Sequence, residues 1–223
     1  MPTFHTLTVK DIRRETPDCV SVAFDVPDTL QKDFAFIPGQ YLTLRTTVGG
    51  TDIRRSYSIC SSPSEADLRV AIKQVPEGQF STFANQQLAV GDTLQVMTPM
   101  GNFHTAISAE YEKQYVAFAA GSGITPVLSI LKTVLETEAN SRFTLFYGNK
   151  NIESIIFHEE IERLKNLYMN RLSVHHVLSR EHLGVELYKG RITAEKCQSF
   201  AKLFFQAQDV DCLLYTSPSP RDS

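Results

Sequence analysis

The pattern of apolar and polar positions divides the chain into two parts with different periodicity. In the first part, short runs rich in Val, Ile, Leu, Thr and aromatic residues are separated by Pro-Gly, Gly-Gly, Glu-Gly and Gly-Asp pairs. Short runs bounded by such turn-forming pairs are typical of strands in a small antiparallel barrel. The runs that predict strands are 6–9, 20–26, 41–46, 57–59, 68–75 and 93–97.

After about residue 108, predicted strands and helices alternate. Strands are expected at 115–120, 143–147 and 172–178, and each is followed by a segment whose apolar residues recur at helical spacing, the last over roughly 194–206. This alternation favours a parallel sheet covered by helices. The predicted fold class is therefore β followed by α/β, with a barrel in 1–107 and an α/β domain in 108–211.

The last residues, 212–223, differ in kind from the rest. Their sequence, Cys-Leu-Leu-Tyr-Thr-Ser-Pro-Ser-Pro-Arg-Asp-Ser, resembles one reading frame of a sequencing adapter. We interpret them as a read-through scar and exclude them from the predicted fold. The α/β domain is then expected to be truncated within its fourth strand. A native Ser/Pro tail is the alternative.

Composition narrows the class of protein. Hydrophobic residues make up 42% of the 223 residues and charged residues 21%, which is ordinary globular usage, and the net charge is −3. This balance gives no general attraction for nucleic acid or an anionic membrane, and neither a membrane-spanning run nor a signal peptide is evident. The four cysteines form no C-x-x-C pair, so a cysteine zinc site or iron–sulfur loop is disfavoured. We expect a cytoplasmic protein without nucleic-acid or membrane partners.

Gly121-Ser-Gly-Ile-Thr-Pro126 lies between a predicted buried strand and an amphipathic helix. Glycines allow a phosphate to approach the backbone, and a helix N-terminus offers free N–H groups. Thr125 is a suitable N-cap and Pro126 a suitable first helical residue. The strand–turn–helix context favours phosphate binding over a purely structural turn.

Two further clusters carry candidate chemistry. Arg55-Ser-Tyr-Ser-Ile-Cys-Ser61 places a guanidinium, an aromatic ring and hydroxyl groups at the end of a strand, where those at alternate positions can share one side and meet a phosphate and a heterocycle. An ordinary exposed strand is the equally weighted alternative. Gly78-Gln-Phe-Ser81 opens a short helical stretch, with Ser81 as a candidate cap and phosphate donor.

Together the three motifs resemble those of the ferredoxin–NADP reductase superfamily. Four segments, 3–9, 38–40, 54–60 and 119–126, are particularly similar to those of the reductase subunits of phenylacetyl-CoA epoxidases. The resemblance covers residues 1–211. It implies that FAD and NADPH bind, that Tyr57 stacks on the flavin, that Ser58 lies near its N5 edge and that Thr125 faces it from the second domain; these three are the candidate catalytic residues. The other implied cofactor-binding residues are Arg55, Ser56, Val70, Ile72, Lys73, Gly78, Phe80 and Ser81 for FAD, and Gly121, Ser122, Gly123, Ile124 and Pro126 for the dinucleotide.

The nicotinamide cofactor is expected to be NADPH, with NADH possible. The second strand of the α/β part ends in Gly-Asn-Lys150 without an acid for a ribose 2′-OH. Ser179 and Arg180, after the third strand, resemble the pair that binds the 2′-phosphate in NADP-preferring relatives. A solvated loop arginine is the alternative.

The resemblance also implies an electron path from NADPH through FAD to a [2Fe–2S] domain, expected only in a missing C-terminal part, and on to the di-iron oxygenase component of a multicomponent monooxygenase in phenylacetate degradation. A stand-alone flavin or cytochrome reductase, or a flavin-binding fragment without turnover, are the alternatives. No metal site is expected: the histidines show no ligand spacing with a third partner, and His175 and His176 are expected on opposite faces of one strand.

Overall fold

The computed structural model describes residues 3–181, 184–205 and 210–214. Contacts divide the chain into two compact units, Met1–Ala106 with Leu128–Thr133, and Ile107–Val127 with Val134–Ser223. In the described residues no helix is long and apolar enough to cross a membrane. The two parts have the predicted architectures, an antiparallel barrel-like sheet and a parallel sheet with helices.

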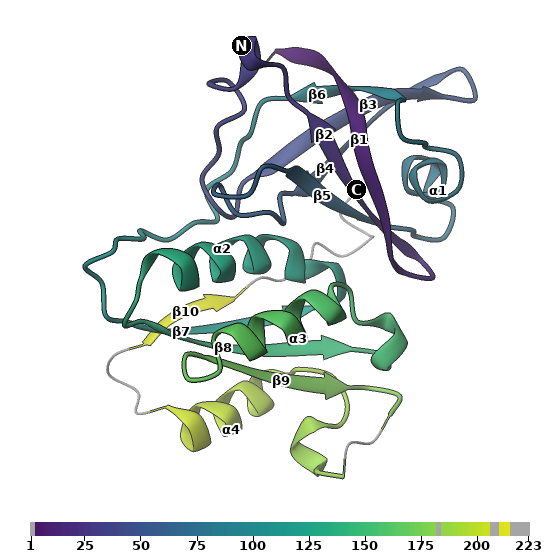
Figure 1. Ribbon diagram of the computed structural model, residues 1–223. Coiled ribbons are helices and arrows are strands. Elements are labelled where there is room, and N and C mark those ends of the chain that lie inside the picture. The colour runs from purple at the N-terminus through teal and green to yellow at the C-terminus, as the bar shows by residue number, and fades with distance from the viewer. Residues whose placement is uncertain (1–2, 182–183, 206–209, 215–223) are drawn as a thin grey trace. The chain divides into compact units, whose positions relative to one another are not determined.

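The first unit is built on a six-stranded sheet in the order β4-β3-β6-β1-β2-β5, whose strand pairs are all antiparallel (Figure 1). The isolated bridge between Ile59 and Val70 joins the two end strands, so the sheet closes on itself. The interior is filled by apolar side chains from alternate strand positions. The elements are β1 (Phe4–Thr16), β2 (Cys19–Asp25), η1 (Asp28–Leu30), β3 (Tyr41–Val48), β4 (Thr51–Ser58), β5 (Leu68–Lys73), α1 (Gln79–Gln86) and β6 (Thr93–Met97).

Helix α1 is held to the barrel by a buried amide. Asn85 donates hydrogen bonds to the carbonyl oxygens of Ile72 (2.9 Å) and Ser81 (2.8 Å). Arg14 on β1 in turn donates to the side-chain and backbone oxygens of Asn85. Because this amide is buried and fully paired, it fixes the helix on strands β1 and β5.

A charged cluster ties β5 to β1 in the same unit. The guanidinium of Arg69, which is 6% exposed, donates to Asp11 at 2.5 Å, to Asp67 at 3.0 Å and to the Ser21 hydroxyl at 3.0 Å. The hydrogen bond from Arg69 lowers the pKa of Asp11. Burial tends to raise the pKa of Asp67, but its hydrogen bonds from Arg69 and Lys10 outweigh burial and lower it.

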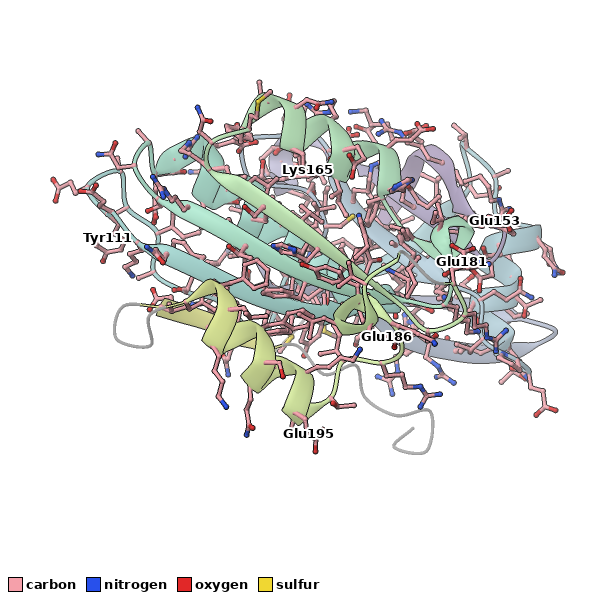
Figure 2. All side chains as sticks on the ribbon, turned by 90° about the horizontal axis from the view of Figure 1, so that it is seen from below. Tyr111, Glu153, Lys165, Glu181, Glu186 and Glu195 are labelled. Carbon is pink, nitrogen blue, oxygen red and sulfur yellow. The ribbon has the colours of Figure 1, made fainter. Side chains whose placement is uncertain are left out.

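The second unit is a four-stranded parallel sheet in the order β10-β7-β8-β9. Helices α2 and α3 cover one face and α4 covers the other (Figure 1). Figure 2 shows the same arrangement from below, with Lys165 on α3 and Glu195 on α4 at opposite faces. The elements are β7 (Gln114–Ala120), η2 (Gly121–Gly123), α2 (Ile124–Thr137), β8 (Arg142–Asn149), η3 (Ile152–Ser154), α3 (His158–Leu167), β9 (Leu172–Leu178), η4 (Glu186–Tyr188), α4 (Ala194–Phe204) and β10 (Val210–Leu214).

Strand β10 corrects one expectation. The sequence interpretation excludes residues 212–214 from the fold, yet they pair in parallel with Val116, Ala117 and Phe118 of β7. The physical reason is that Cys-Leu-Leu, whatever its origin, is apolar enough to continue a parallel strand begun by Val210. Residues 215–223, the rest of the proposed scar, lie outside the described residues.

Candidate functional site

The barrel closes only locally, and this leaves a seam between β4 and β5. Ile59 and Val70 form the single bridge, and the Cys60 amide donates to the Arg69 carbonyl beside it. The antiparallel register of the bridge, continued by two residues, places Tyr57 across from Ile72. The end of β4, the end of β5 and the start of α1 therefore meet where the motifs at 55–58 and 78–81 lie.

The 55–58 motif presents a cation and an aromatic ring at this seam. Tyr57 is half-buried, and its ring centroid lies 5.7 Å from that of buried Phe80. Burial raises the pKa of the Tyr57 phenol, so it stays neutral. Arg55 is exposed, and its guanidinium donates to the neighbouring Arg54 carbonyl at 2.7 Å. The motif thus offers a ring for stacking and an accessible charge.

The hydroxyl groups of Ser56 and Ser58 do not share this face. Successive residues of the continuous strand β4 alternate between its faces, so Arg55 and Tyr57 lie on one face and Ser56 and Ser58 on the other. The Ser56 hydroxyl instead lies 3.0 Å from the Thr43 hydroxyl on β3. Half-buried Ser58 can contribute to the seam face through its backbone.

Three predicted residues lie on β5. The side chains of Val70 and Ile72 are fully buried in the barrel core, so only their backbone can reach a ligand. Lys73 is partly exposed and forms an ion pair with Asp18 at 3.5 Å. Whether these residues contact a cofactor stays a prediction.

The turn before α1 is sterically full at Gly78. A Cβ built on Gly78 would lie 2.5 Å from both the Ser81 hydroxyl oxygen and Val75 Cγ2, although the backbone φ of −74° suits any residue. Gly78 is the N-cap of α1 and no side chain caps the helix, so first-turn N–H groups are left for a ligand.

Ser81 is therefore not the cap that the sequence predicts. It lies in the first turn, where its hydroxyl donates to the Gly78 carbonyl at 3.1 Å and accepts from the Val75 amide at 3.2 Å. These two hydrogen bonds hold the turn in which the chain reverses at Glu77, where φ is +61°. Ser81 is a positioning residue in this structure.

The turn after β7 contrasts with this one. Gly121 has φ +50°, and a Cβ built on it would meet nothing within 4 Å. Its carbonyl accepts a hydrogen bond of 3.0 Å from the hydroxyl of Tyr147, a buried residue of β8. The open side of Gly121 is thus accessible backbone at the carboxyl end of a parallel strand, where ligands of such sheets bind.

The predicted N-cap in this turn is also wrong. Residues Gly121–Gly123 form a 3₁₀ turn that runs directly into α2, so the helix begins at Ile124 with Gly123 as its N-cap. Buried Thr125 lies inside the first turn, and its hydroxyl donates to the Ser122 carbonyl at 3.0 Å. Pro126 is buried in the same turn.

The pair Ser179–Arg180 is exposed just beyond β9. The Ser179 amide donates to the Asn149 carbonyl (3.0 Å) and the Arg180 amide to the Lys150 carbonyl (2.8 Å). The ends of β8 and β9 therefore run side by side. Exposed Lys150 and Arg180 therefore bring two cations to the carboxyl edge of the sheet, with Glu181 alongside (Figure 2). Within the described residues, Arg180 has no ion-pair partner.

The adjacent histidines of β9 lie on opposite faces, as predicted. His175 stacks on Phe146 with ring centroids 4.9 Å apart, and its Nδ1 lies 3.0 Å from the Tyr188 hydroxyl. Burial lowers the pKa of both His175 and His176. On the other face, His176 meets His158 and Glu162 of α3, and the ligand atoms of the three residues lie within 4.8 Å of one another.

This cluster is absent from the predictions made on sequence alone. His158 and Glu162 are four residues apart on one helix, a spacing that places both on one face, so a helical signal is present. The third member lies on a strand, and only the packing of α3 on β9 brings it close. The expectation that no histidine has a third potential ligand is therefore wrong.

Comparison with known proteins matches both units. Residues 6–105 match the family of the oxidoreductase FAD-binding domain, and residues 118–216 match that of the oxidoreductase NAD-binding domain. These matches cover nearly all of the described chain. The chain belongs to the oxidoreductases that combine an FAD-binding domain with an NAD-binding domain.

The chain is similar over most of its length to two curated proteins. It is 45% identical over 199 residues to a subunit of the 1,2-phenylacetyl-CoA epoxidase of Escherichia coli (strain K12), covering 89% of this chain and 56% of that protein. It is 40% identical to the ferredoxin reductase component of 3-ketosteroid-9-alpha-monooxygenase of Rhodococcus rhodochrous, covering 87% and 53%. The chain therefore spans about half the length of the curated relatives it matches.

A solved structure supports the fold. A ferredoxin NADP⁺ reductase from Neisseria gonorrhoeae with bound FAD and NADP aligns with a TM-score of 0.77 at 20% identity, covering 97% of this chain and 86% of that one. At this identity the likeness establishes the fold of this oxidoreductase alone.

Proposed function

We propose that this chain is the FAD- and NADPH-binding part of a reductase that supplies electrons to an oxygenase of the phenylacetyl-CoA epoxidase type. One observation carries the proposal: the 45% identity to the Escherichia coli epoxidase protein extends over 199 residues and so includes both units. In this proposal, electrons pass from NADPH through FAD towards an iron–sulfur domain and a di-iron oxygenase. A cytoplasmic location stays a prediction.

The residues at the barrel seam fit FAD. The Tyr57 ring offers a stacking surface, while exposed Arg55 and the uncapped N-terminus of α1 offer two separate groups suited to phosphate. A pyrophosphate can use both groups, whereas the single phosphate of FMN leaves one unused. When bound, FAD accepts a hydride and releases its two electrons singly.

The carboxyl edge of the parallel sheet fits the dinucleotide. Gly121 leaves open space beside its backbone, and the following helix, α2, supplies a positive dipole end for a pyrophosphate. Lys150 and Arg180, which follow the adjacent strands β8 and β9, supply cations for a 2′-phosphate. No side-chain acid or base is required of the protein, because hydride transfer depends on the position and stacking of the two rings.

The first experiment identifies the flavin. Heat release and chromatography of the purified chain, reconstituted with a mixture of FAD and FMN, should recover FAD. Tyr57→Ala should weaken flavin binding by about 0.5–1.5 kcal/mol beyond lost contact area, whereas Tyr111→Ala, a tyrosine outside the barrel, should leave it unchanged. Folded protein that retains FMN, or no flavin, contradicts the proposal.

The second experiment tests the nicotinamide cofactor. Arg180→Ala should lower the affinity for NADPH about ten- to a hundredfold and leave NADH almost unchanged, since a charge-assisted bond to a phosphate is worth about 1.5–3 kcal/mol. Arg163→Ala, an exposed arginine of α3, is the matched control. Equal losses for both cofactors in Arg180→Ala would reject the assignment.

The acceptor is tested by comparing two routes to cytochrome c. An added [2Fe–2S] ferredoxin should be needed for rapid NADPH-dependent reduction of cytochrome c if the natural acceptor is an iron–sulfur domain. Equally fast reduction without ferredoxin would instead favour a stand-alone cytochrome reductase.

A further inference from the structure

The cluster on the α3 face of β9 has the composition of a metal site. His158 and Glu162 come from the first two turns of α3, and His176 comes from β9. Their ligand atoms lie within 4.8 Å of one another, and His176 Nε2 is 3.8 Å from a Glu162 carboxylate oxygen. Two imidazoles and a carboxylate are a ligand set that binds Zn²⁺ and leaves a fourth position for solvent.

His176 supplies an independent observation. Both of its ring nitrogens are inaccessible to solvent, and neither has a hydrogen-bond partner among the described residues. A buried polar atom without a partner is costly, and nearly all such atoms in folded proteins are paired. His175, its neighbour on the opposite face, follows the rule, because its Nδ1 lies 3.0 Å from the Tyr188 hydroxyl. A bound cation would give a His176 nitrogen the partner it lacks.

We propose that His158, Glu162 and His176 bind a Zn²⁺ ion that links helix α3 to strand β9. Tetrahedral coordination with bonds of about 2.0–2.2 Å places ligand atoms about 3.4 Å apart, so the side chains need to close in only modestly. His176 is 15% exposed and set on a strand, whereas Glu162 is 41% exposed and able to move towards it. Two imidazole ligands favour Zn²⁺ over Mg²⁺ or Ca²⁺, which prefer oxygen ligands.

Lys165 competes with the metal in this arrangement. Lys165 lies three residues after Glu162 on α3, and its ammonium donates to both carboxylate oxygens of Glu162 at 2.9 Å. Binding of Zn²⁺ requires this ion pair to open, because a second cation beside the same carboxylate is repelled. Removal of the Lys165 charge should therefore strengthen metal binding, an effect opposite to that of the ligand variants.

Calorimetry with ZnCl₂ on the full chain tests the proposal, and Co²⁺ absorption spectroscopy reports geometry. Wild type should bind one equivalent, show the intense visible bands of tetrahedral Co²⁺ and melt at a higher temperature with Zn²⁺, while excess Mg²⁺ should not compete. His176→Ala and Glu162→Gln should each weaken Zn²⁺ binding by at least about 100-fold, since even residues behind metal ligands contribute about 10–100-fold. Lys165→Met should tighten binding.

Two control variants test whether Zn²⁺ binds to other residues of the chain. His104→Ala removes an exposed histidine of the barrel unit, and Cys212→Ser removes an exposed thiol; neither should change binding. Should His176→Ala fail to fold, the His158→Ala and Lys165→Met variants still give opposite expected shifts. Absence of saturable binding, an unchanged Co²⁺ spectrum in His158→Ala, or loss of binding in Cys212→Ser would overturn the proposal.

Discussion

The two turns proposed to bind phosphate in this oxidoreductase both contain glycine, but for different physical reasons. Gly78 has an ordinary backbone conformation and no room for a Cβ, whereas Gly121 has a left-handed conformation and open space where a Cβ would point. The first turn is filled by its own side chains, and the second presents bare backbone. A glycine motif alone therefore does not say whether the ligand or the protein occupies the space beside it.

The surroundings of the two turns differ in the same way. Side-chain hydrogen bonds fix the barrel turn, through Ser81 to Val75 and through Asn85 to Ile72. The turn at Gly121 also receives side-chain hydrogen bonds, from Tyr147 to the Gly121 carbonyl and from Thr125 to the Ser122 carbonyl, but the space beside Gly121 stays open. Substitutions at the first turn should thus act through stability, whereas substitutions at the second should also weaken ligand binding directly, and this difference can be tested.

The largest effect is expected for Gly78→Ala. The added methyl group must displace the Ser81 hydroxyl and so break both of its hydrogen bonds, which should destabilise the barrel by about 1–3 kcal/mol and lower its flavin content. Urea unfolding with flavin quantification measures both. Gly148→Ala is the matched control, because the nearest atom to its Cβ would be the flexible end of Ile192, at 3.2 Å, and the Ala119 carbonyl oxygen lies at an ordinary contact distance of 3.7 Å. A fully stable Gly78→Ala would contradict the steric account.

Gly121→Ala should cost about 1–2 kcal/mol, the strain of a left-handed backbone in an ordinary residue, and should also weaken NADPH binding. Gly121→Asn should recover much of the stability, because Asn tolerates this conformation, yet still crowd the ligand. Gly49→Ala, at φ +56° with equally open surroundings, should lose stability alone. Unchanged NADPH affinity in both Gly121 variants would argue against a ligand there.

Thr125→Val should have a smaller effect, a loss of about 0.5–1.5 kcal/mol in the free energy of unfolding. It removes one hydrogen bond, to the Ser122 carbonyl, from a helix that already begins before Thr125. Thermal unfolding followed by circular dichroism would measure it. A larger loss, with fraying of α2, would mean that Thr125 acts as the N-cap after all.

The smallest expected effect is a loss of stability around Arg69 of the barrel at acid pH. Arg69 lowers the pKa of Asp11 and Asp67 below the ordinary 3.8, so their stabilising contribution is fully present above that pH and is lost as pH falls through the lower folded values. The effect is small because solvent screens partly exposed carboxylates. Hydrogen exchange at pH 5 and 3 should show loosening of β1 and β5 around this cluster, which Arg69→Met should abolish. In the second unit burial tends to raise the pKa of Glu162 but its hydrogen bond from Lys165 lowers it, so an acid response there should persist in Arg69→Met. A response of β1 and β5 that survives Arg69→Met would contradict the prediction.

The sequence predicts elements best where the hydrophobic pattern is regular. Strands β6 and β9 have the predicted bounds, because each combines alternating or continuous apolar residues with a clear turn. Strand β4 is predicted only at 57–59 but spans Thr51–Ser58, since polar side chains are acceptable on an end strand of the sheet. Strand β1 extends to Thr16 through polar residues and two register irregularities that no simple alternation predicts.

The site is predictable in its motifs and less so in its local geometry. The motifs at 55–58, 78–81 and 121–126 lie at the seam and at the sheet edge, yet Ser81 and Thr125 donate to backbone instead of capping helices. Whether a residue caps a helix depends on the residue at which the helix begins. A segment rich in glycine does not determine that residue from sequence. The cluster around His176 depends on the packing of α3 on β9, and sequence spacing alone does not contain that information.

The opposite faces of β9 also bear on how this sheet avoids misfolding. His175 is opposite Phe146 on β8 and stacks on it, while the next residue, His176, is opposite Tyr147 and turns towards α3. A slip of the strand by a single residue would carry each imidazole to the wrong side and forfeit the aromatic stack and the meeting with His158 and Glu162 together. The two histidines thus favour the native register of β9. A strand shifted by one residue loses both sets of contacts in addition to its apolar packing.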